Sequence, residues 1–193
     1  MTVFFTADTH FGHENVIKYA RRPFRNADEM DIELVKKWNA VVNPDDLVYH
    51  VGDVALCSFP RAMWLVSSLY GRKRLVFGNH DKILRKKKEF IALFEHTSDI
   101  FEVRVEDPSC EWGYQPIVLC HYAMRVWNKS HYGAWQLYGH SHGSLSDDVH
   151  SLSLDVGVDC WNYAPVSYDV IRARMVKKVW KPIDHHGEKR EDE

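Results

Sequence analysis

The sequence contains no long apolar stretch. No run approaches the roughly 20 apolar residues that a membrane-spanning helix requires. The chain starts Met1-Thr2-Val3-Phe4-Phe5 and passes directly into polar residues, without a basic segment or a small-residue cleavage site. We therefore expect no membrane association and no signal peptide, and a cytoplasmic location.

Cysteine and net charge are also scarce. The 193 residues include four cysteines, none of them in a C-x-x-C pair, and the net charge is -2. The scattered cysteines argue against a disulfide framework or a cysteine zinc site and favour a reduced compartment. A net charge near zero gives no overall field that would attract nucleic acid or a membrane. Histidine, in contrast, is abundant, with 12 residues.

Length and composition indicate one globular domain. Hydrophobic residues make up 45% of the chain and charged residues 27%, which is the balance of a soluble protein. The length suffices for one well-buried domain and is too short for two of ordinary size. We expect the domain to span residues 1–180, followed by a polar, disordered tail over 181–193.

Apolar β-type runs alternate with amphipathic stretches, which predicts a layered α/β protein. Strands are expected at Val3–Thr6, Leu47–Val51, Lys73–Phe77, Phe101–Val105, Ile117–Cys120, Gln136–Tyr138 and Ser151–Val156. Helices are expected at Glu14–Arg21, Ala27–Val42, Pro60–Leu69, Lys82–Phe94 and Tyr168–Lys178. Asn26 and Ser58 are candidate N-caps for the second and third of these helices.

Five of the apolar runs end in residues that can bind a metal. These ends read Asp8-Thr9-His10, Gly52-Asp53, Gly78-Asn79-His80-Asp81, His121 and Gly139-His140-Ser141-His142. In sheets covered by helices, ligands gather outside the carboxyl ends of the strands. Residues at i and i+2 project the same way in an extended chain, so D-x-H and H-x-H can each direct both side chains to one site. Each glycine lets the backbone turn sharply as the strand ends.

The candidate ligands offer carboxylate, imidazole and amide groups but no sulfur. They are Asp8, His10, Asp53, Asn79, His121, His140 and His142. This mixture favours manganese, iron, zinc, nickel or cobalt over a thiolate-selected metal or calcium. Seven ligands exceed what one four-coordinate zinc ion needs, and they suit two ions that share a carboxylate.

Taken in order, these motifs resemble the calcineurin-like metallophosphoesterase superfamily, from Asp8 to about Val166. The resemblance implies a four-layer α/β/β/α sandwich of two mixed β-sheets, with residues 1–180 as the catalytic domain. It implies that one metal is held by Asp8, His10, Asp53 and His142, and that Asp53 bridges to a second metal held by Asn79, His121 and His140. His80 would contact the phosphate and assist the leaving group, and Asp81 would orient or polarise His80.

The resemblance also implies a reaction. Two ions can bridge a hydroxide that attacks the phosphorus atom, and His80 can stabilise the leaving oxygen. The chain lacks the Arg of the G-D-x-x-D-R-G motif after Gly52-Asp53, which argues against a protein phosphatase. The small bacterial and phage members that it most resembles are mainly phosphodiesterases. We therefore predict a phosphodiesterase acting on small-molecule or nucleotide-type diesters, with manganese as the favoured metal and a phosphomonoesterase as an alternative.

Other interpretations stay open at this point. His13 follows the first ligand pair closely, so it either reaches the substrate phosphate together with Asn79 and His80 or caps the following helix. A nuclease is suggested by Trp127 and Trp135, which would stack on bases, and by the basic clusters Arg21-Arg22-Pro23-Phe24-Arg25, Arg72-Lys73-Arg74 and Arg85-Lys86-Lys87-Lys88. A silent protein-binding scaffold is the third alternative, but such scaffolds tolerate loss of ligands, and here all are present.

Overall fold

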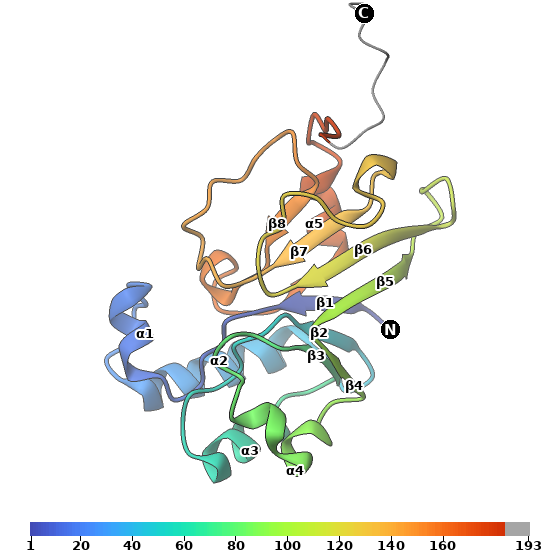
Figure 1. Cartoon of the computed structure of the whole chain (residues 1–193). Helices are drawn as coiled ribbons and strands as arrows, with labels where there is room; N and C mark the ends of the chain where they lie inside the picture. Colours follow the sequence, from blue (N-terminus) through green and yellow to red (C-terminus); the bar gives the residue numbers. More distant parts are fainter. Residues whose placement is uncertain (184–193) are drawn as a thin grey trace, which may run out of the picture.

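The computed structural model describes residues 1–183 and contains two mixed β-sheets (Figure 1). The first has the strand order β4-β3-β2-β1-β9, in which four strands run parallel and β9 pairs antiparallel with β1. Its strands are β1 (Val3–Thr6), β2 (Leu47–His50), β3 (Arg72–Val76), β4 (His96–Ser98) and β9 (Val166–Ser167). Most of the tail predicted at 181–193 lies outside the described residues.

The second sheet has the order β5-β6-β7-β8. Its strands are β5 (Ile100–Glu106), β6 (Tyr114–Cys120), β7 (Trp135–Tyr138) and β8 (Ser153–Asp155). β5 and β6 pair antiparallel, whereas β6, β7 and β8 run parallel. The two sheets confirm the prediction of a mixed α/β fold with two mixed sheets. β4 and β9 were not predicted, because β4 consists of His-Thr-Ser and β9 of only two residues, and neither contains an apolar run.

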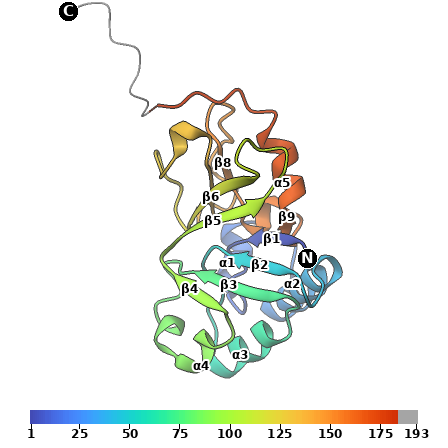
Figure 2. The same cartoon turned by 90° about the vertical axis from the view of Figure 1, so that its right-hand side faces the viewer.

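Most of the helices cover one face of the first sheet, and the second sheet lies against the other face. The helices are α1 (Glu14–Tyr19), α2 (Ala27–Val41), α3 (Phe59–Ser67), α4 (Lys88–Ile91) and α5 (Tyr168–Met175). Figures 1 and 2 show α2, α3 and α4 on the outer side of the first sheet. α5 buries Tyr168, Ile171 and Met175, one helical face, against the apolar cluster between the sheets. Within residues 1–183, no helix has the length and apolar character needed to cross a membrane.

The core consists of two apolar clusters on opposite faces of the first sheet. Phe4 packs with α2 and α3, whereas the next residue, Phe5, packs between the sheets with Leu119 and Leu137. Successive strand residues point to opposite faces, and here both faces are buried. The central strands are therefore apolar throughout, which is why they are easy to recognise in the sequence.

Helix ends agree with the prediction only in part. The side chain of Asn26 accepts a hydrogen bond from the Glu29 backbone N–H at 2.9 Å, so this cap is confirmed. The Ser58 side chain makes no capping bond. The helix predicted at Lys82–Phe94 is wrong: a 3₁₀ turn at Leu84–Lys86 is followed by an extended Lys87 and then α4. Leu84 and Phe90 are both buried, although in a continuous helix they would lie about 120° apart around the axis.

Candidate metal centre

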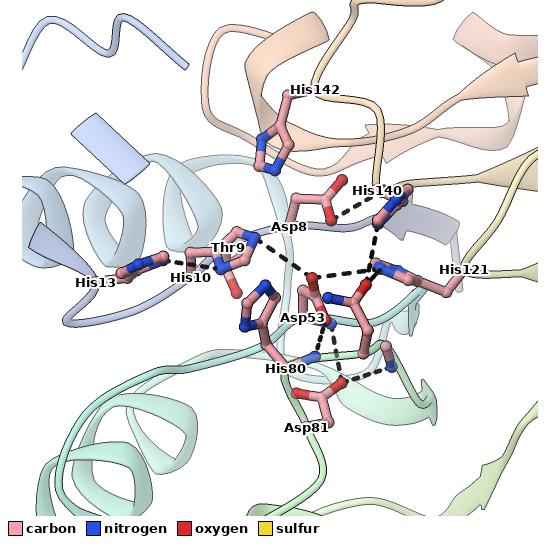
Figure 3. Close-up of polar contacts among 12 residues, drawn as sticks. Asp8, Thr9, His10, His13, Asp53, His80, Asp81, His121, His140 and His142 are labelled. Atoms are coloured by element: carbon pink, nitrogen blue, oxygen red, sulfur yellow. Dashed lines mark hydrogen bonds and ion pairs between the residues drawn. The ribbon is translucent and has the colours of Figure 1, made fainter. Parts of the chain in front are cut away.

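The predicted ligands meet where strands of both sheets end (Figure 3). Asp8 and His10 follow β1, Asp53 follows β2, and Asn79 follows β3 in the first sheet. His121 follows β6, and His140 and His142 follow β7 in the second sheet. Two groups of donors emerge from this arrangement. Each group takes side chains from both sheets.

The first cluster consists of Asp8, His10 and His142, each with one ligand atom within 4.8 Å of the others. One carboxylate oxygen of Asp8, Oδ1, accepts a hydrogen bond from the His140 backbone N–H at 3.0 Å. Asp8 Oδ2 and His10 Nε2 are buried and have no hydrogen-bond partner among the described residues. Buried polar atoms are almost always satisfied, so unpaired donors that converge in this way fit a metal ion.

The second cluster consists of Asp53, His121 and His140, with Asn79 beside them. His121 Nδ1 lies 2.8 Å from the Val51 carbonyl. A carbonyl can only accept, so Nδ1 carries a proton, and Nε2 is the nitrogen that can bind a metal. That Nε2 faces Asp53 Oδ2 at 3.3 Å and Asn79 Oδ1 at 3.1 Å. Asn79 Oδ1 is also 3.0 Å from His140 Nδ1. A shared cation would satisfy these acceptors.

Asp53 lies beside both clusters. Its Oδ2 atom is 3.5 Å from His10 Nε2 and 3.3 Å from His121 Nε2. Its other oxygen, Oδ1, accepts a hydrogen bond from the His80 backbone N–H at 2.8 Å. A single carboxylate oxygen therefore faces donors of the first cluster on one side and of the second on the other.

The electrostatics of the site favour a bound cation. Burial raises the pKa of Asp8 to about 7 and lowers the pKa of His10 to about 2. Burial also opposes ionisation of Asp53 and His121, but their hydrogen bond and mutual charge attraction outweigh it. The pKa of Asp53 falls to about 2 and that of His121 rises to about 9. The protein thus holds a neutral His10 and a carboxyl that needs nearby positive charge to ionise fully. This donor set fits divalent metal ions.

The donor loops have an unusual backbone. Asp8, His10, Asp53, His140 and His142 all have positive φ, between 48° and 66°. Residues with a Cβ rarely adopt this left-handed region, and such strain is concentrated at functional sites. The expected extended chain at D-x-H and H-x-H is therefore wrong. The paired donors are presented by tight turns in which alternate residues are left-handed.

Two glycines of the motifs serve close packing rather than an unusual φ. A Cβ at Gly78 would lie 2.1 Å from Asp53 Oδ1, and a Cβ at Gly139 would lie 2.7 Å from Asp8 Oδ2. Neither contact leaves room for a side chain. Each glycine therefore lets the chain approach one of the two cluster carboxylates.

His80 and Asp81 have different surroundings. His80 is exposed, and its ring centroid lies 5.3 Å from that of His10. Asp81 is fully buried and accepts hydrogen bonds from the backbone N–H groups of Asp53, Val54 and Gly78, at 2.8–2.9 Å. The expected contact with the His80 ring is not among the hydrogen bonds of Asp81 in the described part of the chain. Asp81 instead ties the β2 and β3 loops together.

His13 is turned toward the site. It is the N-cap residue of α1, but its side chain makes no capping hydrogen bond. Its Nδ1 atom lies 3.4 Å from His10 Nδ1, and its ring centroid lies 6.0 Å from that of His80. Burial lowers the pKa of His13. The side chain is therefore available to the site rather than to the helix.

A cavity of about 770 Å³ opens beside the two clusters. Its lining includes donors of both clusters, His80, residues of α1 and the chain from Ser141 to Ser144. Its volume falls in the range of small-molecule sites.

The structure also reveals site residues that sequence reasoning missed. The Tyr122 ring lies 4.7 Å from the His140 ring, and its hydroxyl donates to Asn79 Oδ1 at 3.5 Å. Its position directly after His121 was the available signal. The stacking role predicted for Trp135 is wrong, because Trp135 starts β7, is buried and stacks on Tyr168. Trp127 is partly buried and donates its indole N–H to the Ala134 carbonyl.

Two facing mixed sheets with clustered carboxylate and imidazole donors at their strand ends define a metallophosphoesterase-type centre. Residues 1–161 match the calcineurin-like phosphoesterase superfamily domain. The chain belongs to this superfamily, which makes it a hydrolase of phosphate esters.

Relatives extend over most of the chain. It is 31% identical to an uncharacterized protein of Methanocaldococcus jannaschii, over 91% of this chain and 92% of that protein. It is 30% identical to the gene 66 protein of Mycobacterium phage L5, over 81% of this chain and 86% of the phage protein. A crystal structure of a protein of unknown function from Aquifex aeolicus shares the fold, with a TM-score of 0.65 and 23% identity, over 89% of this chain and 98% of that chain.

Proposed function

We propose that this protein is a phosphodiesterase that uses two divalent metal ions, with manganese as the favoured metal. The observation that carries the proposal is the position of Asp53 beside both donor clusters, at a cavity that His80 also lines. Two ions that share a carboxylate are the usual arrangement for in-line displacement at phosphorus.

The residues divide between the two ions as follows. Asp8, His10, Asp53 and His142 would hold the first, and Asp53, Asn79, His121 and His140 the second. When bound, the two ions supply Lewis-acid stabilisation of phosphate charge and lower the pKa of water. The buried and unpaired Asp8 Oδ2 and His10 Nε2 support this division.

His80 would act on the leaving group. Its exposed ring lines the cavity, and its backbone N–H bonds to Asp53, which fixes its position relative to the donors. From there it could donate a hydrogen bond to the oxygen that develops negative charge, an effect typically worth about 10²–10⁴-fold in rate. Asp81 would support this indirectly, by holding the loop that carries His80. His13, on the same cavity wall, would contact the phosphate or its second substituent.

The cavity supports a diester rather than a monoester. It extends past the donors along α1, where Val16 and the 78%-exposed Tyr19 offer an apolar and aromatic wall. A monoester has one substituent and would leave this wall uncovered, whereas a diester can place its second substituent there. Arg21 is the single Lys or Arg among the described residues lining the cavity.

The basic clusters give little support to the nuclease alternative. Arg22 is buried. Arg72 and Arg74 pair with Glu95, at the start of β3 and therefore away from the donor end of that strand. Arg85 pairs with Asp99 and lies over the Phe77 ring. None of these four lines the cavity. Arg21 does, but it is the single Lys or Arg among the described lining residues, which therefore form no continuous basic track of the kind a polymer would require.

Hydrolysis of bis-p-nitrophenyl phosphate with added Mn²⁺ tests the proposal directly. The panel should include p-nitrophenyl phosphate, 2′,3′- and 3′,5′-cyclic nucleotides, and single- and double-stranded DNA and RNA. We expect turnover of small diesters, weaker turnover of the monoester and no strand cleavage. Strand cleavage would favour the nuclease, and two bound metals without any turnover would favour the scaffold.

His80→Ala separates catalysis from metal binding. We expect both metals to be retained and kcat to fall by about 10²–10⁴-fold, with the smaller loss for substrates that have good leaving groups. Equal losses for alkyl and nitrophenyl diesters would contradict the leaving-group role. Asn128→Ala is a matched surface control, because Asn128 is exposed, bonds to Glu102 and does not line the cavity.

A further inference from the structure

One member of the basic segment Arg21–Arg25 lies inside the protein. The Arg22 side chain has 0% exposure. Its Nη2 atom donates to the Asp8 carbonyl at 2.6 Å, and its Nη1 atom donates to the Thr9 carbonyl at 3.0 Å. Those two carbonyls belong to the loop that presents Asp8 and His10. The guanidinium therefore holds the backbone of Asp8 and of Thr9, the residue that precedes His10.

The same guanidinium holds Asp159, whose side chain is 6% exposed. Arg22 Nε and Nη2 donate to the two carboxylate oxygens of Asp159, each at 2.8 Å. This is the paired geometry that arginine makes with carboxylates. A lysine could not reproduce it, because its ammonium is a point charge.

Asp159 in turn holds the third donor. Its Oδ2 atom lies 2.7 Å from His142 Nδ1. A carboxylate only accepts, so His142 Nδ1 donates its proton and Nε2 keeps the lone pair that a metal needs. A carboxylate that accepts from the far nitrogen of a ligating histidine fixes both its ring orientation and its tautomer.

Stability alone does not explain the buried ion pair between Arg22 and Asp159. A buried ion pair is a weak source of stability, because the loss of hydration offsets most of the charge attraction. Here one arginine is linked to all three donors of the first cluster: to Asp8 through its carbonyl, to His10 through the carbonyl of the preceding residue Thr9, and to His142 through Asp159. In the second cluster, the corresponding bond of His121 goes to a backbone carbonyl, that of Val51.

We propose that Arg22 and Asp159 form a positioning unit that orients the donors of the first cluster and raises its affinity for a metal ion. The proposal rests on the proposed function only for the premise that the clusters bind metal, and it does not depend on which ester is hydrolysed.

Asp159→Asn tests the unit with little change in volume. The metal-free full-length protein is titrated with Mn²⁺ by calorimetry and with Co²⁺ by visible absorption, and metal content is counted by elemental analysis. We expect one of the two metal equivalents to bind about 10–100-fold more weakly, while the other keeps its affinity. Arg22→Lys should weaken the same equivalent, because the charge stays but the paired contact is lost.

Asp107→Asn is the matched control. Asp107 is also buried, and it pairs with Arg172 and accepts from Tyr168 without contacting either cluster. We expect this variant to lower the Tm and leave both metal affinities unchanged. The control thus reports what the loss of a buried ion pair does by itself.

Two results would overturn the proposal. One is equal weakening of both equivalents in Asp159→Asn. The other is a lowered Tm with unchanged metal affinities, as in the control. An unsubstituted protein that binds two metals but hydrolyses no diester would refute the proposed function and leave this inference standing. An unsubstituted protein that binds no metal would refute both.

Discussion

The two donor clusters have the same composition, one aspartate and two histidines each, but the protein supports them differently. In the second cluster the supports act through the backbone: His121 donates to the Val51 carbonyl, and the Asp81 carboxylate accepts the backbone amides of Asp53 and Val54. In the first cluster they are side chains, because Arg22 and Asp159 join the donors.

The difference indicates how each cluster responds to change. Backbone groups are fixed by the sheets and cannot be removed by a substitution. A side-chain support can be removed by one substitution. We therefore expect the orientation of the His121 ring to resist substitution. The orientation of the His142 ring, and with it the metal affinity of the first cluster, should change when Asp159 or Arg22 is replaced.

The largest effect is expected at Asp53, the residue shared by the two clusters. Asp53→Asn should weaken both metal equivalents and lower kcat/KM by at least about 10²–10³-fold. Asp8→Asn should remove the metal of the first cluster and leave the other in place. Elemental analysis after dialysis, together with diester turnover, distinguishes the two variants. If Asp53→Asn lost only one equivalent, Asp53 would belong to a single cluster.

A smaller effect, confined to the first cluster, is expected from Gly139→Ala. The new Cβ would lie 2.5 Å from Ala7 Cβ and 2.7 Å from Asp8 Oδ2, so Asp8 must move. We expect a loss of about 1–3 kcal/mol in the free energy of unfolding and weaker binding of one metal equivalent.

Gly133→Ala is the control for this substitution. Gly133 has φ 82° and nothing within 4 Å of an added Cβ. The free energy of unfolding should therefore fall only by the cost of placing alanine in the left-handed region, about 1–2 kcal/mol. Denaturant unfolding and Mn²⁺ titration of both variants provide the comparison. Unchanged metal binding in Gly139→Ala would show that Asp8 tolerates the displacement.

The last expected effect is a pH dependence that differs between the clusters and needs no substitution. In the metal-free protein the pKa of Asp8 is about 7 and that of His121 is about 9. A metal must displace these protons, so apparent affinity should fall as pH falls, by up to about tenfold per pH unit for each displaced proton. The loss should set in below pH 7 for Asp8 and below pH 9 for His121. Mn²⁺ titrations between pH 6 and 8.5 test this, and pH-independent affinities would contradict it.

The fold was predictable where strands are buried on both faces. β1 was predicted to the residue, because Val3–Thr6 is apolar on both faces of its sheet. α4 was not, because Lys82–Phe94 satisfies helical spacing locally, whereas the chain is extended at Lys87 and buries Leu84 and Phe90 on either side of that break. β9 depends on pairing with β1 across most of the chain, which no local pattern contains.

In the site, the positions of the donors were predictable but their supports were not. A donor such as His121 can be recognised in the sequence because it directly follows an apolar strand. Arg22 looks like one residue of a basic surface cluster, and only the fold shows that it is buried against Asp159, 137 positions away. Asp81 was assigned to the His80 ring, yet its oxygens accept backbone amides. Long-range partners of this kind leave no periodic signal.

The origin of the donors in two sheets has a mechanical consequence. Asp8 and His142 lie 134 positions apart in the chain, and Asp53 and His140 lie 87 apart, so each bound ion would act as a cross-link between the sheets. Closing loops of such length in the unfolded chain is entropically unfavourable. Ions that bind only the folded form therefore stabilise the contact between the sheets in proportion to the logarithm of their concentration. The metal-free protein should open first along the edge where the strands end.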